Sequence, residues 1–346
     1  MIKIFLTFVF ILNGLFVDAP ENGSNNINIG QTTLEFYDVK RTRPITIDLW
    51  YPTSESLKES DKSFSPFRRE FTVSDAKLPS KKFPLIMISH GTGGSRLSLE
   101  WLAQRLVKNG YLVAAPDHWG NTFDNPIAIE FVKPWERALD MSFALTRLLE
   151  DIAFKAVIDE DKIGALGFSY GGYTVLALAG AVLDYELLLK FHNTPEGKKE
   201  INSIPEFPNL WAQLQSPQFI RMTQNIPNLK DDRFKAFFTI SPGTARGFND
   251  RKQFKDIQSP VFIIGSESDS ITPVESYARK YHNLIPHSEY FEFKGKVGHY
   301  VMLAEASEEL KEEAPNPFTD HPSVDRHTIH NKVSDLAILF FNKTLE

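Results

Sequence analysis

The order of apolar and polar segments predicts a chain in which strands alternate with helices. Short, continuous apolar runs are typical of strands covered on both faces, and they lie at residues 83–89, 111–115, 234–240, 260–264 and 290–293. Segments with apolar positions at helical spacing lie at residues 96–108, 135–149, 273–284 and 325–341. This alternation predicts an α/β fold in which helices flank a mainly parallel central sheet.

Three parts of the chain depart from this rhythm. Residues 32–39 and 44–50 alternate enough to form a strand pair at an antiparallel edge of the sheet. Residues 52–80 are rich in Ser, Lys, Pro and Glu, which is typical of a long surface excursion. Residues 184–232 spread aromatic residues among prolines, and we interpret them as an inserted helical cap. The cap is either a lid over a pocket or a structural excursion packed on the sheet.

The N-terminus resembles a secretory signal peptide over residues 1–19. Lys3 precedes an apolar stretch that is too short to span a bilayer comfortably. A cut after Ala19 fits the small-residue rule but leaves Pro20 beside the cut, so the cleavage site stays open. A buried N-terminal strand or an uncleaved anchor is the alternative. We expect a secreted or periplasmic protein with a single domain at residues 20–346.

The composition is that of an ordinary globular protein, with 42% hydrophobic and 24% charged residues among 346. The net charge of −6 provides no basic field that would attract nucleic acid or an anionic membrane. Cysteine is absent, which excludes thiol nucleophiles, disulfides and thiolate metal sites.

The stretch around Ser169 carries the strongest chemical signal. An apolar run leads into Gly167-Phe-Ser-Tyr-Gly171 and a second apolar run follows, which predicts a strand, a sharp turn and a helix. Such a turn lifts a serine hydroxyl out of the backbone, where a base can activate it. A side chain at either flanking glycine would collide with the neighbouring strand or helix. We interpret Ser169 as a nucleophile, although a bare Gly-x-Ser-x-Gly is also a common loop composition.

An acid and a base are expected at the carboxyl ends of later strands, where loops converge. Asp269 follows the strand at residues 260–264 and is the preferred acid, with Glu267 as its rival. The alternative role for Asp269 is to cap the next helix. His299 follows the last strand and is the preferred base. Along the chain, nucleophile, acid and base then come in the order of the α/β-hydrolase arrangement.

Other histidines compete with this interpretation. His90 and His118 also lie at strand ends, but both precede Ser169 and fit the order badly. His327 and His330 are spaced to share one face of a helix as zinc ligands, but no third ligand is placed convincingly nearby. We expect neither a metal nor a cofactor.

A developing negative charge on the substrate would need two backbone N–H groups. One is expected from Tyr170, directly after the nucleophile. The other is expected from the glycine-rich loop at residues 90–94, with Thr92 preferred and Gly93 as the alternative. This loop lacks both the lysine of a P-loop and the G-x-G-x-x-G pattern, so a phosphate cradle is not favoured.

Taken together, the motifs resemble a known family. They are Leu49-Trp-Tyr-Pro-Thr53, Ser89-His-Gly-Thr-Gly-Gly94, Ala115-Pro-Asp-His118, Gly167-Phe-Ser-Tyr-Gly-Gly172, Gly265 through Pro273 and Gly298-His299. They are similar to bacterial α/β-hydrolases named predicted dienelactone hydrolases, to serine esterases of the platelet-activating factor acetylhydrolase type and, more distantly, to polyester-cleaving cutinases. True dienelactone hydrolases use a cysteine, which this chain lacks. The acetylhydrolases place their acid after the preceding strand, where this chain has Ser241-Pro242, so the resemblance implies a cutinase-like acid at Asp269.

We therefore expect an α/β-hydrolase fold and a serine hydrolase that cleaves short-chain or lipid-like carboxylic esters through an acyl-enzyme. Ser169 would attack, His299 would transfer the proton and Asp269 would orient the imidazole. The expected partner is a small-molecule or lipid ester. Two alternatives stay open: a peptidase or amidase that uses the same three residues, and a non-catalytic protein that uses the fold to bind a ligand.

Overall fold

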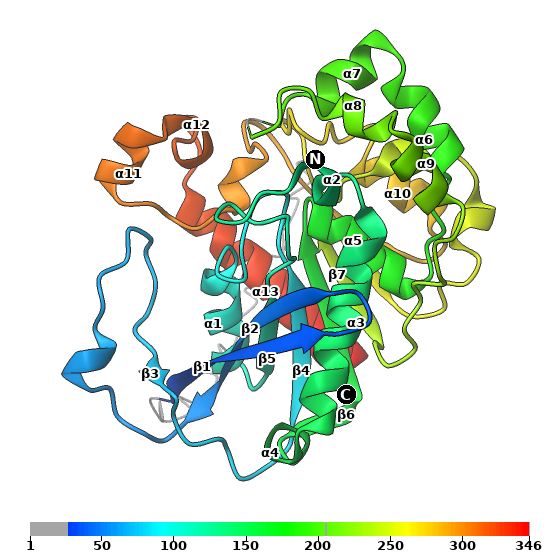
Figure 1. Cartoon of the computed structure of the whole chain (residues 1–346). Coiled ribbons are helices and arrows are strands. Elements are labelled where there is room, and N and C mark those ends of the chain that lie inside the picture. The colour runs from blue at the N-terminus through cyan, green and yellow to red at the C-terminus, as the bar shows by residue number, and fades with distance from the viewer. Residues whose placement is uncertain (1–26, 205, 346) are drawn as a thin grey trace, which may run out of the picture.

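The computed structural model describes residues 27–204 and 206–345 and is built around a nine-stranded sheet (Figure 1). The strands are β1 (Asn28–Asp38), β2 (Arg43–Thr53), β3 (Val73–Ser74), β4 (Phe83–Ser89), β5 (Leu112–Pro116), β6 (Ile158–Phe168), β7 (Ala236–Ile240), β8 (Val261–Ser266) and β9 (Glu289–Phe293). Their spatial order is β3-β1-β2-β5-β4-β6-β7-β8-β9. β2 pairs antiparallel with β1 and β5, and the other described pairs are parallel. The predicted mainly parallel sheet is confirmed.

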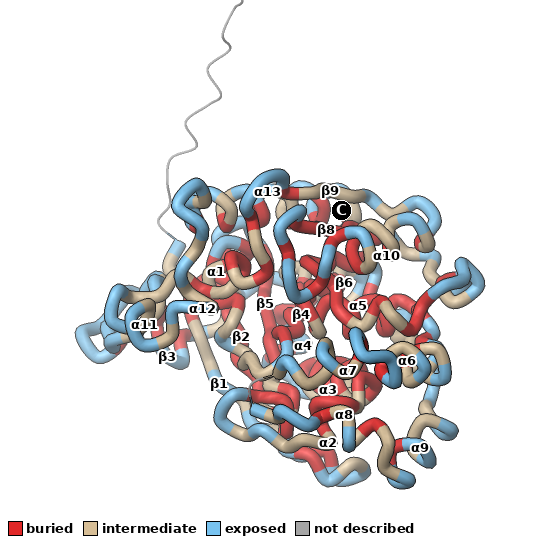
Figure 2. Tube along the Cα trace, turned by 90° about the horizontal axis from the view of Figure 1, so that it is seen from above, coloured by how far each residue is buried: buried red, intermediate tan, exposed pale blue. Residues whose placement is uncertain are grey.

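Helices cover both faces of the sheet, because successive side chains of a strand point to opposite faces. On one face, α3 (Pro134–Glu150), α5 (Tyr170–Ala179) and α10 (Ala278–Leu284) pack on a first apolar core. On the other face, α1 (Glu100–Lys108) and α13 (Arg326–Thr344) pack on a second core. Figure 2 shows buried positions along the central strands and exposed positions around the periphery.

The cap, residues 184–232, lies outside the sheet. Its described residues contain the helices α6 (Tyr185–His192), α7 (Pro195–Ile201), α8 (Trp211–Leu214) and α9 (Pro217–Thr223). Figure 1 shows them as a group beside the sheet, at the upper right. A third apolar cluster fixes the cap to the body, because Phe131 and Trp135 pack with Leu210, Leu214 and Phe219.

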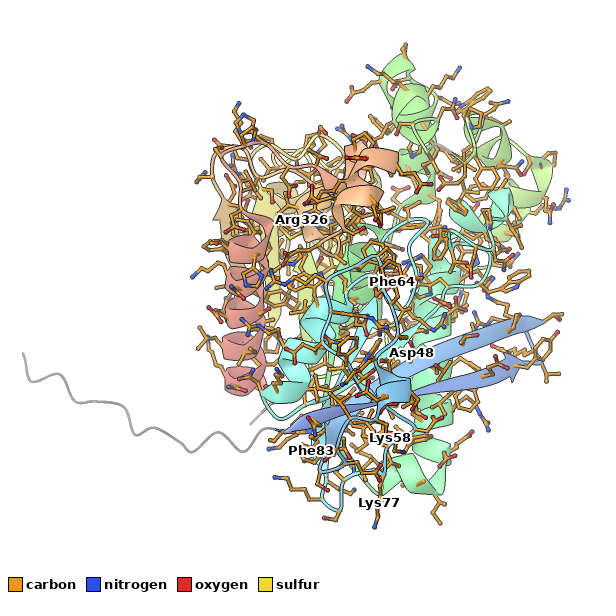
Figure 3. The ribbon with its side chains drawn as sticks, turned by 90° about the vertical axis from the view of Figure 1, so that its left-hand side faces the viewer. Asp48, Lys58, Phe64, Lys77, Phe83 and Arg326 are labelled. Atoms are coloured by element: carbon orange, nitrogen blue, oxygen red, sulfur yellow. The ribbon has the colours of Figure 1, made fainter. Side chains whose placement is uncertain are left out.

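The segment at residues 52–80 is held to the sheet more closely than the sequence predicts (Figure 3). β3 pairs with the start of β1, and Val73 within it is fully buried. The Tyr51 hydroxyl donates to the Ala76 carbonyl at 2.6 Å, and the Thr72 hydroxyl donates to Gln31 Oε1 at 2.7 Å. The segment is still a surface excursion over most of its length, but residues 72–76 are fixed to the sheet by partners distant in sequence, which the sequence did not predict.

Two helices begin later than predicted. The helix expected at residues 96–108 begins at Glu100, because the Asp117 carboxylate binds both the backbone N–H and the guanidinium of Arg96, each at 2.6 Å. The helix expected at residues 273–284 begins at Ala278. Tyr277, just before it, has a non-helical backbone and donates its hydroxyl to Glu200 of the cap.

Four short helices have no counterpart among the predicted elements. They are α2 (Ala128–Phe131), α4 (Ile152–Lys155), α11 (Glu308–Glu313) and α12 (Pro315–Phe318). Within residues 27–204 and 206–345, no helix has the length and apolar character needed to cross a bilayer. The predicted signal peptide at residues 1–19 lies outside the described residues.

A buried histidine on α13 links the stability of the fold to pH. The ring of His330 stacks on Trp101 at 3.7 Å between centroids, and its Nε2 donates to the Val301 carbonyl at 2.8 Å. Burial lowers the pKa of His330 to about 4. The unfolded chain, with an ordinary histidine pKa of about 6.5, takes up this proton first as the pH falls. Stability is therefore lost between roughly pH 6.5 and 4, by up to about 3 kcal/mol from this residue.

We therefore predict that the free energy of unfolding falls less steeply in His330→Gln than in the wild type between about pH 7.5 and 4.5. Urea denaturation at each pH measures this slope. The control is His321→Gln, whose side chain is exposed, and it should keep the wild-type slope. Equal slopes for His330→Gln and the wild type would contradict the prediction.

Candidate active site

Ser169 occupies a sharp turn between β6 and α5. Its backbone angles are φ 55° and ψ −117°, a combination that residues other than glycine rarely adopt. Its N–H donates to the Ile240 carbonyl at 2.9 Å, and its carbonyl accepts from the Gly243 N–H at 2.8 Å. The turn is thus held against the chain that follows β7, at the carboxyl edge of the sheet.

The flanking glycines allow this turn to lie against its neighbours. A Cβ on Gly171 would lie 1.9 Å from the Ser89 carbonyl oxygen at the end of β4. A Cβ on Gly167 would lie 2.0 Å from the Gly171 carbonyl oxygen. Both contacts are with backbone, which cannot move aside, so the expected collision is confirmed at both positions.

The structure brings Ser169, His299 and Asp269 together. The Ser169 hydroxyl lies 2.9 Å from His299 Nε2, and His299 Nδ1 lies 2.7 Å from Asp269 Oδ2. Asp269 lies after β8 and His299 after β9, so the three side chains meet from separate loops at one edge of the sheet. Ser169 is 9% exposed and His299 is 4% exposed, so only a small part of each residue contacts solvent.

Asp269 is held as a carboxylate by several donors. The N–H groups of Ile271 and Thr272 donate to its Oδ1 at 3.0 and 2.7 Å, and the Thr272 hydroxyl donates to its Oδ2 at 2.9 Å. Burial alone would raise the pKa of Asp269, but the charge of His299 and the bonds from His299 and Thr272 outweigh it and lower this pKa below its usual value. Asp269 therefore binds the turn that follows it. It does not cap the next helix, because α10 begins only at Ala278, with Tyr277 before it.

The rival acid lies elsewhere. The Glu267 carboxylate is exposed and accepts from the Gly295 N–H at 2.7 Å. It therefore contacts the loop before His299 and not the imidazole. The Thr272 hydroxyl, which no motif indicated as part of the site, lies 3.3 Å from His299 Nδ1.

The two candidate donors in the loop at residues 90–94, Thr92 and Gly93, differ in whether their N–H groups already have a partner. The N–H of Gly93 donates to Asn121 Oδ1 at 3.3 Å and so already has a partner. The N–H of Thr92 has no hydrogen-bond partner among the described residues. This N–H is therefore available to a ligand, which favours Thr92 over Gly93. Asn121 was not indicated by any sequence motif.

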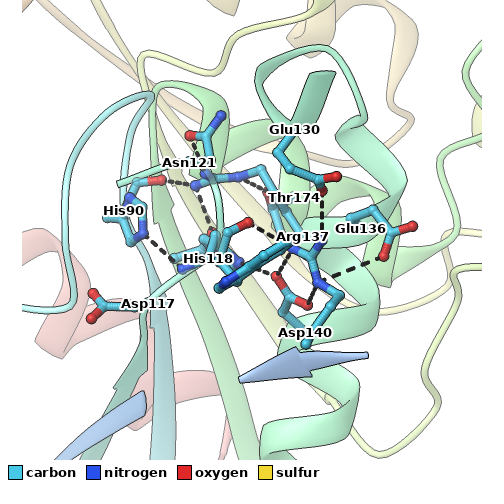
Figure 4. Close-up of polar contacts among 12 residues, drawn as sticks. His90, Asp117, His118, Asn121, Glu130, Glu136, Arg137, Asp140 and Thr174 are labelled. Atoms are coloured by element: carbon cyan, nitrogen blue, oxygen red, sulfur yellow. Dashed lines mark hydrogen bonds and ion pairs between the residues drawn. The ribbon is translucent and has the colours of Figure 1, made fainter. Parts of the chain in front are cut away.

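A second Ser-His-Asp set lies beneath this loop. Ser89 Oγ lies 2.9 Å from His118 Nε2, and His118 Nδ1 lies 3.2 Å from Asp140 Oδ2 (Figure 4). All three side chains are fully buried, so no substrate reaches them. Burial and the charge of Arg137 hold the pKa of His118 well below its ordinary value, and the ring is neutral. This set is a structural network.

The two candidate zinc ligands, His327 and His330, each have a different partner within the protein. His327 lies 2.8 Å from Glu305 through its Nδ1, whereas His330 bonds the Val301 carbonyl. Across the described part of the chain, no group of three or more His, Cys, Asp or Glu side chains is arranged to hold a metal ion.

Comparison with known proteins places this architecture in a family. A model described as "Alpha/beta hydrolase family" matches residues 85–313, which is more than half of the chain. The chain belongs to the alpha/beta hydrolase family. The mostly parallel sheet flanked by helices is the fold expected from the motifs.

Several relatives of this alpha/beta hydrolase are enzymes of known name. Cutinase est1 of Thermobifida alba is 25% identical over 205 residues, which are 59% of this chain and 48% of that protein. The chain thus spans about half the length of this relative. Dipeptidyl-peptidase 5 of Porphyromonas gingivalis is 27% identical over 111 residues, only 15% of its length. A ferulic acid esterase from Streptomyces cinnamoneus has the same fold, with a TM-score of 0.62 and 18% identity over 95% of this chain and 92% of that chain.

The packing of the turn yields a stability prediction. Gly171→Ala should reduce the melting temperature strongly or prevent folding, because its Cβ would overlap the Ser89 carbonyl. Gly110→Ala is the control: Gly110 has φ +89°, but no atom lies within 4 Å of the position that an added Cβ would take, so only backbone strain of about 1 kcal/mol is expected. Circular dichroism melts measure both. Similar melting temperatures for the two variants would contradict the close approach at Gly171.

Proposed function

We propose that this alpha/beta hydrolase is a serine esterase that cleaves carboxylic esters through a covalent acyl-enzyme. The observation that carries the proposal is the continuous series of hydrogen bonds from Ser169 through His299 to Asp269. A serine hydroxyl gains nucleophilic strength when a base accepts its proton and an acid orients that base. The names of its relatives, cutinase and ferulic acid esterase, support ester cleavage.

The proposed reaction has two halves. Ser169 Oγ attacks the ester carbonyl carbon while His299 Nε2 takes the hydroxyl proton, and Asp269 stabilises the imidazolium. The resulting oxyanion binds the N–H groups of Thr92 and Tyr170. Collapse breaks the ester C–O bond, and His299 returns its proton to the departing alcohol. Water then attacks the acyl-enzyme with His299 again as base, which releases the acid and restores Ser169.

The cap also indicates which acyl group the substrate would carry. Phe207 of the cap packs edge to face on Phe131 at 4.9 Å between ring centroids. Phe131 in turn lies 3.9 Å from the position that a Cβ on Gly93 would take. This aromatic pair borders the loop that carries Thr92, which supports substrates with an apolar or aromatic acyl group. Export through the predicted signal peptide also belongs to this proposal.

The mechanism predicts a sharp difference between two serines. Ser169→Ala should lower kcat for p-nitrophenyl esters by a factor on the order of 10⁶. Ser89→Ala is the control, because it removes a hydroxyl from the sealed Ser-His-Asp set and should leave kcat within about threefold. A fluorophosphonate probe followed by mass spectrometry should label Ser169 alone. Hydrolysis that survives in Ser169→Ala would disprove the proposed function, and cleavage of amides but not esters would favour a peptidase.

The acyl pocket is tested separately. Phe207→Ala should raise KM for aromatic or long-chain p-nitrophenyl esters by about three- to tenfold, because an aromatic contact contributes roughly 0.5–1.5 kcal/mol. KM for the acetate ester should change little. The control is Trp211→Ala, another aromatic of the cap, which contacts Lys198 and Asn193 and not the loop at residues 90–94. An unchanged chain-length profile in Phe207→Ala would exclude this pair from the pocket.

A further inference from the structure

Arg137 lies on the first turn of α3, between the two chain segments that would supply the oxyanion hole (Figure 4). One segment is the loop at residues 90–94, and the other is the start of α5. Arg137 is 1% exposed, so its guanidinium contacts protein on all sides. Each of its three nitrogens donates a hydrogen bond, and these bonds connect Arg137 to both segments, in one case through Asn121.

The first set of contacts reaches the loop that carries Thr92. Arg137 Nη2 donates to the His90 carbonyl, two residues before Thr92. Arg137 Nη1 donates to Asn121 Oδ1 at 2.9 Å, and the same oxygen accepts from the Gly93 N–H. The Thr92 N–H belongs to the peptide between Gly91 and Thr92, and the peptides before and after that one are thus held, directly or through Asn121, by one guanidinium. This fixes the direction in which the free Thr92 N–H points.

The second set of contacts reaches α5. Arg137 Nε donates to the Thr174 hydroxyl at 3.3 Å, and that hydroxyl donates to the Tyr170 carbonyl at 3.1 Å. The guanidinium carbon also lies 4.8 Å from the centre of the Tyr170 ring, within the range of a cation–π contact. Tyr170 supplies the other proposed oxyanion N–H, so the same side chain contacts both halves of the hole.

Burial of the Arg137 guanidinium lowers the stability of the fold, because no carboxylate among the described residues pairs with it. Neighbouring Arg41 and Arg43 pair with the carboxylates of Asp140, Glu136 and Glu130. In the described part of the chain, Arg137 itself pairs with no carboxylate. Burial lowers its pKa to about 9, yet the side chain stays protonated at neutral pH. A buried cation without an ion-pair partner lowers stability, and Arg137 offsets this only through neutral acceptors and one ring.

We propose that Arg137 is a positioning residue that sets the spacing of the two oxyanion N–H groups, an inference that rests on the proposed function. It touches neither the substrate nor the reacting atoms. Its hydrogen-bonding fork, rather than its charge, holds the Thr92 peptide and the first turn of α5 at a fixed separation. A small displacement of either N–H weakens transition-state binding without changing how the ground-state ester binds.

The test compares Arg137→Lys and Arg137→Met with Arg43→Lys as the matched control. Arg43 is another buried arginine of this network, 3% exposed, but it contacts Glu130, Asp140 and the Trp119 carbonyl and not the loop at residues 90–94. Active serines are counted with a fluorophosphonate, so that kcat for p-nitrophenyl acetate refers to folded enzyme. Affinity for a trifluoromethyl ketone, whose serine adduct carries an oxyanion, is the second readout.

We expect kcat per active serine to fall about tenfold in Arg137→Lys and about 100-fold in Arg137→Met, with KM within about twofold. The inhibition constant of the trifluoromethyl ketone should rise by the same factors. Arg43→Lys should reduce the melting temperature but keep kcat. A wild-type kcat in the Arg137 variants, or an equal loss in Arg43→Lys, would overturn the proposal.

If Arg137→Met does not fold, Arg137→Lys and Asn121→Ala decide the matter. Asn121→Ala removes the link from Arg137 to Gly93 and should lower kcat about tenfold at unchanged KM. A wild-type kcat in Asn121→Ala would show that the loop does not depend on this link. Failure of the proposed function is seen separately, as hydrolysis that persists in Ser169→Ala, whatever the Arg137 variants do.

Discussion

The site depends on one backbone contact, the approach of Gly171 to the Ser89 carbonyl at the end of β4. Because neither partner has a side chain in the way, the first turn of α5 lies directly beside the loop that follows β4. Ser169 must then take its unusual backbone angles, and bonds to Ile240 and Gly243 hold it there. The hydroxyl then meets the imidazole of His299, which lies in the loop after β9, the last strand of the sheet. A larger distance between Gly171 and Ser89 would move the Ser169 turn away from the end of β4 and from the chain that follows β7.

Two Ser-His-Asp sets in one chain have similar hydrogen-bond contacts, so this geometry alone does not distinguish the set that we propose to react. Ser89, His118 and Asp140 have the same order of contacts as the set around Ser169. The two sets differ in how deeply they are buried and in the backbone conformation of their serine. Ser89 ends a regular strand within the core, whereas Ser169 is on a strained turn at the edge of the sheet. The buried set pairs polar groups with one another inside the core, in the way that satisfied polar networks rigidify a core.

The sequence predicted the features that depend on neighbours along the chain. β4 was predicted to the residue, because a continuous apolar run between polar segments has one interpretation in a covered sheet. Asp269 and His299 were selected by their position after strands, and the structure brings both to Ser169. Thr272, Asn121 and Arg137 were not selected as site residues, because their importance lies in partners far away in sequence. The late start of α1 at Glu100 has the same cause, the bond from Arg96 to Asp117.

The cap begins and ends at nearly the same point of the body. The N–H of Asp231, where the chain leaves the cap, donates to the Leu178 carbonyl at the end of α5, where the chain enters it. A short turn between these two points would join α5 to β7 and keep the strand order, but it would remove Leu188, a buried member of the first core. The cap is therefore a module that can lengthen, shorten or change sequence without disturbing strand order. Ser169, Asp269 and His299 all lie outside the cap, so changes within it need not alter the residues that we propose carry the reaction.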